Sequence, residues 1–131
     1  MKKRTLVLFA AAVTAIVMTG CSTVETTSGF NGLGVTERRS QPIAHINARV
    51  TGAFLFDIFP VFCGSVNNVD KVAAFVNTVS LENTMGLVSR QARGLGATKL
   101  VDITSYQNTY WMWYTLLLWK RQTQVSATAI K

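Results

Sequence analysis

The sequence predicts an α+β fold, a small two-layer sandwich in which one helix covers an antiparallel sheet of about four strands. Two observations carry this prediction. Apolar residues alternate with polar ones near both ends of the region 43–131, which is typical of half-buried strands. Between these stretches, apolar residues recur every three or four positions from 81 to 95, which is typical of an amphipathic helix. Runs of strands combined with one helix favour this architecture.

The helix carries signals for both of its ends. Its apolar face is predicted to consist of Leu81, Met85, Val88, Ala92 and Leu95. Ser80 is a good N-cap and Glu82 suits the positive first turn, while the arginines at 90 and 93 suit the negative end. Gly94 or Gly96 supplies the left-handed residue that ends the helix.

Strands are predicted on both sides of this helix. One covers most of 43–59, and its apolar run 54–59 is too short to span a membrane, so we expect it to join the core. Residues 72–79 favour a strand, with the first turns of a helix as the alternative. Residues 99–105 form a strand, 106–109 a turn, and 120–131 the final strand. The predicted order is β-β-α-β-β, or β-α-β-β if 72–79 is helical.

Residues 1–20 have the three parts of a secretory signal peptide. Positions 2–4 are basic, 6–18 are apolar apart from Thr14, and small residues follow at 19 and 20. This arrangement predicts export and cleavage. An uncleaved N-terminal anchor helix is the alternative, although the apolar run is short for a membrane span.

The end of this segment resembles the lipobox of bacterial prolipoproteins. The matching residues are Met18-Thr19-Gly20-Cys21, and Met18 departs from the Leu that is commoner there. The resemblance implies cleavage between Gly20 and Cys21, a thioether-linked diacylglycerol on the Cys21 thiol, and a fatty acyl group such as palmitate on its new amino group. Several acyl chains hold a protein firmly to a membrane. Ser22 resembles the residue of lipoproteins that reach the outer membrane, which implies a lipid-anchored protein facing the periplasm.

Residues 21–42 are expected to join this lipidated cysteine to the globular domain at 43–131. Positions 22–41 are rich in Ser, Thr, Gly and Asn and have little periodicity, which is typical of a flexible tether. Phe30, Leu33 and Val35 allow the alternative that part of this segment pairs as an edge strand.

A second resemblance covers roughly the last 50 residues. The segment 92–102 (ARGLGATKLVD) resembles the "A-x-x-x-G-A-x-x-[LIV]-[LIV]" segment of small bacterial envelope lipoproteins such as the TRL-like family, and 125–130 resembles their closing strand. The motif is structural, because the Gly ends the helix and the Ala packs under it. It implies a fold and no catalytic residue.

No residue pattern in the chain predicts catalysis, a cofactor or a metal site. His45 is the only histidine, and neither H-x-x-x-H nor C-x-x-C spacing occurs. Cys63 and His45 offer a thiol-imidazole pair on paper, but no orienting partner is identifiable, so Cys63 is expected to be a buried thiol. The bases are scattered, with no run longer than two beyond position 4, so no nucleic-acid partner is expected.

The densest aromatic stretch of the chain lies between 110 and 119. It contains all three tryptophans of the protein, and its aromatic residues are Tyr110, Trp111, Trp113, Tyr114 and Trp119. We expect Trp119 to be core, and Trp111 and Trp113 to be partly exposed with Tyr110 and Tyr114 in an interaction ridge, because Trp and Tyr favour membrane interfaces and protein hot spots. The alternative is that the whole cluster packs on the helix.

These features together predict a lipid-anchored, non-enzymatic lipoprotein of the cell envelope. It would act as an interaction module, anchored in the membrane by Cys21 and contacting an envelope protein or the bilayer through the ridge. The alternative is a periplasmic sensor or small-ligand-binding lipoprotein with an aromatic pocket.

Overall fold

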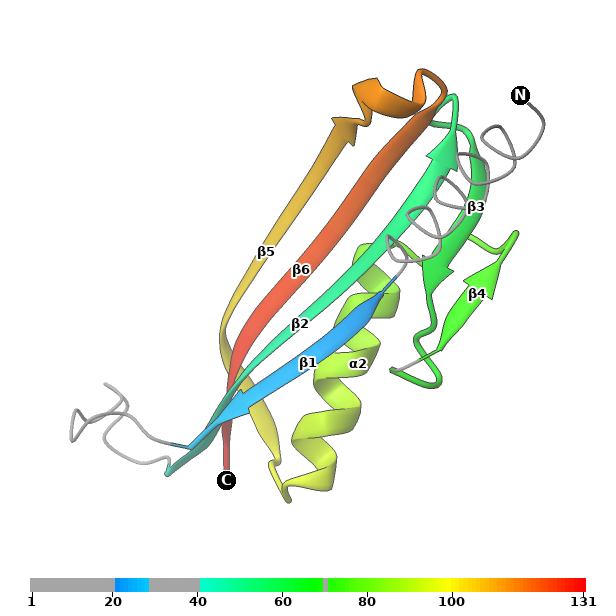
Figure 1. The fold of residues 1–131 in the computed structure, drawn as a ribbon. Helices are drawn as coiled ribbons and strands as arrows, with labels where there is room; N and C mark the ends of the chain where they lie inside the picture. The colour runs from blue at the N-terminus through cyan, green and yellow to red at the C-terminus, as the bar shows by residue number, and fades with distance from the viewer. Residues whose placement is uncertain (1–20, 29–40, 70) are drawn as a thin grey trace, which may run out of the picture.

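The computed structural model describes residues 21–28, 41–69 and 71–131, and the predicted signal peptide lies outside them. The elements follow the order β1 (Ser22–Thr27), β2 (Pro42–Leu55), β3 (Phe59–Gly64), β4 (Val72–Ala74), α2 (Leu81–Gly94), β5 (Lys99–Trp111), a short 3-10 helix (Trp113–Thr115) and β6 (Leu118–Ile130). The fold is α+β, with one helix and an antiparallel sheet among the described residues (Figure 1). No helix in these ranges is long and apolar enough to cross a membrane.

The sheet has six strands, whereas about four were predicted. Its order is β4-β3-β2-β6-β5, and β1 pairs with the other half of the β2 edge that β3 occupies. One additional strand is β1, which lies in the segment predicted to be a tether. Another is β3, because the apolar run after residue 55 turns back and pairs with β2 instead of ending it. The strand preference for 72–79 is confirmed only for Val72–Ala74.

Helix α2 agrees with the sequence prediction in position and in both caps. The Ser80 side chain accepts a hydrogen bond from the Asn83 N–H at 3.1 Å. At the other end Gly96 has φ +80° and donates to the Arg93 carbonyl, while Ala97 donates to the Ala92 carbonyl, each at 3.0 Å. This pair of bonds is a Schellman motif, so Gly96 and not Gly94 is the left-handed stop.

The core lies between α2 and one face of the sheet. It is formed by Ile46, Ala48 and Val50 of β2, Val125, Ala127 and Ala129 of β6, and Leu87, Val88 and Ala92 of α2. The predicted helix face is correct at its centre, but Leu81 and Leu95 at its ends are exposed. The opposite face of the sheet is polar, with Asn47 Oδ1 accepting from the side chains of Gln124 and Ser126.

The predicted turn at 106–109 does not exist. Strand β5 runs without a break through these residues, and the chain reverses after Trp111 instead. Most side chains of β5 are exposed, and an exposed edge strand accepts polar residues that resemble a turn sequence. The pairing of these residues with β6, rather than their turn propensity, therefore decides this assignment.

Candidate functional site

Cys21 lies at the sheet edge and has an exposed side chain. Its backbone N–H donates to Thr51 Oγ1 at 3.0 Å, and its carbonyl accepts from the Thr51 N–H at 2.8 Å and lies 2.8 Å from Thr51 Oγ1. The backbone of Cys21 is therefore held against β2 while its thiol faces solvent. A substituent on the sulfur meets no obstacle from burial, and an acylated amino group would keep the N–H that Thr51 accepts.

Ser22, the residue after Cys21, is buried in the fold and hydrogen-bonded. Ser22 is 1% exposed, and its hydroxyl lies 2.6 Å from the Ser65 carbonyl oxygen and 2.9 Å from that of Val69. Gly64, the last residue of β3, approaches the backbone of Cys21 and Ser22 so closely that a Cβ there would overlap it. Strands β1 and β3 thus lie end to end along β2, with Cys21 at their junction.

This geometry corrects the tether prediction for its first residues. Ser22–Thr27 pairs with His45 to Val50 of β2 over its whole length, so the alternative of an edge strand holds here. Residues 29–40, which include Phe30, Leu33 and Val35, lie outside the described residues. A lipid on Cys21 would therefore be attached almost directly to the sheet.

The second feature is the end of the sheet where two chain reversals meet. The turn between β2 and β3 and the connection between β5 and β6 lie side by side (Figure 1). The Phe56 N–H donates to the Leu117 carbonyl at 2.9 Å, and Leu55 pairs with Leu118. Beneath them Ala53, Met112 and Leu118 form a small buried cluster, against which Leu55 and Val61 pack.

Nine large apolar or aromatic side chains project from this end, and we call them the apolar tip. Ile58, Trp113 and Leu116 are 70–73% exposed, and the other members are about half exposed or more. The full set is Phe56, Ile58, Phe59, Tyr110, Trp111, Trp113, Tyr114, Leu116 and Leu117. The prediction that the apolar run 54–59 joins the core is therefore wrong for three of its residues, because the chain turns at Phe56 and leaves the sheet's covered face.

Bulky residues occupy left-handed backbone positions in these two reversals and directly after β4. Phe56 has φ 52° and Leu116 φ 60°, and Phe75, whose N–H donates to the Val61 carbonyl, has φ 58°. Such positions favour Gly or Asn and cost other residues about 1–2 kcal/mol. Since Phe56, Phe75 and Leu116 are 55–78% exposed, burial within the fold does not offset that cost.

The aromatic ridge predicted from the sequence is divided as expected. Trp119 is half-buried and packs against the main core, whereas Trp111 and Trp113 are 51% and 71% exposed. Trp111 and Trp119 are cross-strand partners with ring centroids 6.5 Å apart, and Trp113 meets Tyr114 edge-on at 6.0 Å. The exposure has a different cause from the predicted one, because the turn lies after Trp111 and not before Tyr110.

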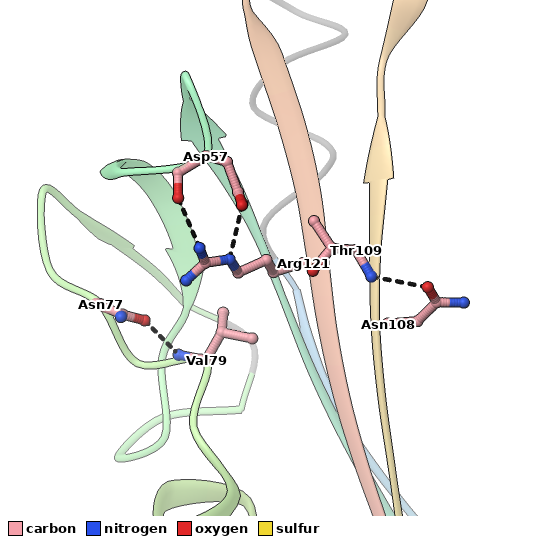
Figure 2. A network of polar contacts seen from close by, with 6 residues as sticks. All are labelled: Asp57, Asn77, Val79, Asn108, Thr109 and Arg121. Carbon is pink, nitrogen blue, oxygen red and sulfur yellow. Dashed lines mark hydrogen bonds and ion pairs between the residues drawn. The ribbon is translucent and has the colours of Figure 1, made fainter.

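An ion pair between Arg121 and Asp57 lies beside the tip. Arg121 of β6 donates from Nε to Asp57 Oδ1 at 2.8 Å and from Nη2 to the Asp57 carbonyl at 2.6 Å (Figure 2). Its guanidinium also lies 4.7 Å from the ring centroid of buried Phe54. Figure 2 also shows the loop before α2, where Asn77 Oδ1 accepts from the Val79 N–H at 3.1 Å. No local sequence pattern links Asp57 to Arg121, because they are 64 residues apart in the chain.

The structure does not bring His45 and Cys63 together. His45 Nδ1 lies 3.3 Å from Thr128 Oγ1, while Cys63 pairs with Gly52, seven residues further along β2, or about 23 Å at the usual rise of a strand. Cys63 is fully buried, and this burial raises the pKa of its thiol, against opposing contributions from Thr78 and Arg121. Within the described ranges, no group of three potential ligand side chains could hold a metal ion.

One hollow of about 220 Å³ lies between the end of α2 and the start of β5. Its lining contains no aromatic side chain and consists of Ser89, Ala92, Arg93, Ala97, Thr98, Lys99 and Leu100. It lies at the opposite end of β5 from the apolar tip, so the aromatic residues do not contribute to it.

Comparison with known proteins adds no assignment, since no protein-family model, curated protein or solved structure matches this chain. The resemblances to the lipobox and to the TRL-like segment stay predictions.

Proposed function

We propose that this protein is a lipid-anchored, non-enzymatic lipoprotein of the cell envelope that acts as an interaction module. The observation that carries the proposal is the position of Cys21, which has an exposed thiol and a backbone hydrogen-bonded to Thr51. A diacylglycerol on this sulfur and an acyl group on this nitrogen are compatible with every hydrogen bond that Cys21 makes to Thr51. The proposed location is the outer membrane, with the domain facing the periplasm.

The short path from Cys21 to the sheet gives this anchor a mechanical role. Because β1 begins at the next residue, the lipid would hold this edge of the sheet close to the bilayer instead of letting the domain diffuse on a long tether. Confinement of this kind raises the effective concentration of an exposed surface toward partners at the membrane, so high intrinsic affinity is unnecessary. The surface available for such contacts is the apolar tip.

The test is mass spectrometry of the protein purified from bacterial membranes. We expect a mature N-terminus at Cys21 carrying a diacylglycerol and an acyl group. Cys21→Ser should give an uncut precursor without lipid. Cys63→Ala is the matched control, since it removes the other cysteine and should leave the lipid in place. A mature Cys21 with a free thiol would overturn the proposal.

A further inference from the structure

We infer that the apolar tip is a second membrane contact, which inserts into the interfacial region of the bilayer to which Cys21 is anchored. This inference rests on the proposed function, because it assigns the bilayer itself as the partner of the exposed surface. The argument uses the composition of the tip, its backbone conformation, its charges and its distance from Cys21.

The composition of the tip suits a membrane interface. It contains two tryptophans and two tyrosines, namely Trp111, Trp113, Tyr110 and Tyr114. Amphipathic rings of this kind concentrate where lipid headgroups meet the acyl chains. The same end also presents aliphatic and phenylalanine side chains that are 47–73% exposed, including Ile58, Phe59 and Leu116. Contiguous apolar surface of this kind marks a contact site rather than scattered exposure.

The backbone conformation of the tip also supports a contact of these side chains outside the fold. Phe56 and Leu116 adopt left-handed conformations in the two reversals, where Asn or Gly would be easier to accommodate. Burial within the fold does not offset the conformational cost at either residue, since the two side chains are 55% and 73% exposed. Transfer of these side chains from water into a bilayer would be favourable and would offset the conformational cost of the two left-handed positions.

The charges near the tip favour an anionic lipid surface. Among the described residues, Asp57 is the carboxylate at this end of the sheet, and it forms an ion pair with Arg121. Lys120 pairs with Ala53 near the tip and, by strand alternation, lies on the same sheet face as Cys21, whereas Arg49 on that face lies opposite Thr23, on the far side of Cys21 from the tip. Glu25 shares that face but lies farther from the tip, opposite Asn47. Basic residues beside Trp and Tyr are attracted to anionic headgroups.

The anchor and the tip lie on the same half of the sheet. Cys21 lies opposite Thr51, and the tip begins at Phe56, five residues further along the chain, or about 16 Å at the rise of a strand. Interfacial insertion reaches about 5–10 Å below the headgroups. Both contacts can therefore reach one membrane surface when the long axis of the sheet lies oblique to it.

The experiment measures tryptophan fluorescence of the full chain purified from membranes and reconstituted into vesicles of phosphatidylethanolamine and phosphatidylglycerol. All three tryptophans lie between 111 and 119, so the intrinsic signal reports this end of the molecule alone. We expect a blue shift of the emission relative to detergent-free buffer, quenching by lipids brominated near the headgroup, and protection from acrylamide.

A stripped variant and a matched control test which residues cause the effect. Phe56→Asn, Ile58→Ser and Leu116→Asn remove apolar surface while keeping all three reporters and easing the two left-handed positions, and this triple variant should lose most of the quenching. Leu81→Ser, Leu95→Ser and Ile103→Ser remove apolar residues outside the tip that are 38–48% exposed, and this control variant should keep the quenching. Equal quenching in the two triple variants would overturn the inference.

The readouts separate this inference from the proposed function. A lipidated protein whose tryptophans stay accessible to acrylamide in vesicles would keep the anchor and overturn the tip contact. A photoreactive residue at position 59 that crosslinks to protein instead of lipid in whole cells would also overturn it. The unlipidated Cys21→Ser chain, which keeps residues 1–20, should still be quenched in vesicles, and adding the three substitutions of the stripped variant to it should remove the quenching, so that loss of the lipid leaves the tip contact measurable.

Discussion

Arg121 and Asp57 join the β2–β3 turn to the neighbouring strand through both the side chain and the backbone of the aspartate. The guanidinium reaches the Asp57 carboxylate at 2.8 Å and its carbonyl at 2.6 Å, and it covers the face of Phe54. Because the two side chains are 34% and 38% exposed, the ion pair by itself contributes little to the free energy of folding. The combination of the ion pair, the hydrogen bond to the Asp57 carbonyl and the contact with Phe54 contributes more.

The first prediction concerns this contact. Arg121→Gln should lower the free energy of unfolding by about 1–2 kcal/mol, since it removes both the ion pair and the stacking on Phe54. Arg49→Gln, an exposed arginine of β2, is the control and should change it by less than about 0.5 kcal/mol. Urea denaturation of the two variants measures the difference. Equal effects would show that the Arg121 contacts do not stabilise the turn.

The second prediction concerns backbone strain at Phe56. Phe56→Asn should raise the free energy of unfolding by about 1 kcal/mol, because Asn tolerates φ 52° better than Phe does. The same variant should weaken vesicle contact, so the free energy of unfolding should rise while the fluorescence quenching by vesicle lipids falls. Phe59→Asn, at an exposed site of β3, should give no gain in stability. A loss of stability in Phe56→Asn would contradict the strain argument.

The third prediction tests the burial of Ser22. Ser22→Asp should lower the free energy of unfolding by more than about 2 kcal/mol, because a buried carboxylate would face the carbonyl oxygens of Ser65 and Val69. Thr23→Asp, one residue later and exposed, should have little effect. If thermal denaturation gives similar values for both, β1 does not pack as described, and the tether interpretation is restored.

The fourth prediction compares two glycines. Gly64→Ala should destabilise the protein by about 1–3 kcal/mol, because its Cβ would overlap the backbone of Cys21 and Ser22. Gly86→Ala, in the interior of α2 with nothing within 4 Å of the added carbon, should stabilise it by about 0.5–1 kcal/mol. Opposite signs in chemical denaturation are expected, and a neutral Gly64→Ala would contradict the close approach of β1.

The fifth prediction concerns Cys63 and pH. Burial raises the pKa of its thiol, so the unfolded chain loses this proton first as the pH rises. The unfolded state then binds fewer protons, and stability should fall as the pH passes through the ordinary thiol range, while below that range the full stability remains. Cys63→Ala should abolish this part of the pH dependence. Rapid alkylation of Cys63 in the folded protein would contradict its burial.

Helix α2 and the central strand could be predicted from the sequence because their signals are local. Ser80, the helical spacing around Val88 and the glycine at 96 specify the helix within seventeen consecutive positions. The alternation of Ile46, Ala48 and Val50 likewise specifies which face of β2 is buried. The greater exposure of Trp111 and Trp113 relative to Trp119 agrees with the expectation, but it comes from the reversal after Trp111 and not from the predicted turn at 106–109.

The tertiary structure alone decided which apolar residues face water. Phe54 is buried and Phe56 is exposed, although both belong to the same apolar run, because the chain reverses between β2 and β3 and the neighbouring turn comes from residues 112–117. The pairing of Ser22–Thr27 with β2 and the contact of Asp57 with Arg121 likewise join segments far apart in the sequence. Local patterns determine α2 and the buried face of β2, whereas long-range pairing determines β1, β3 and the full length of β5 and which of their side chains remain exposed.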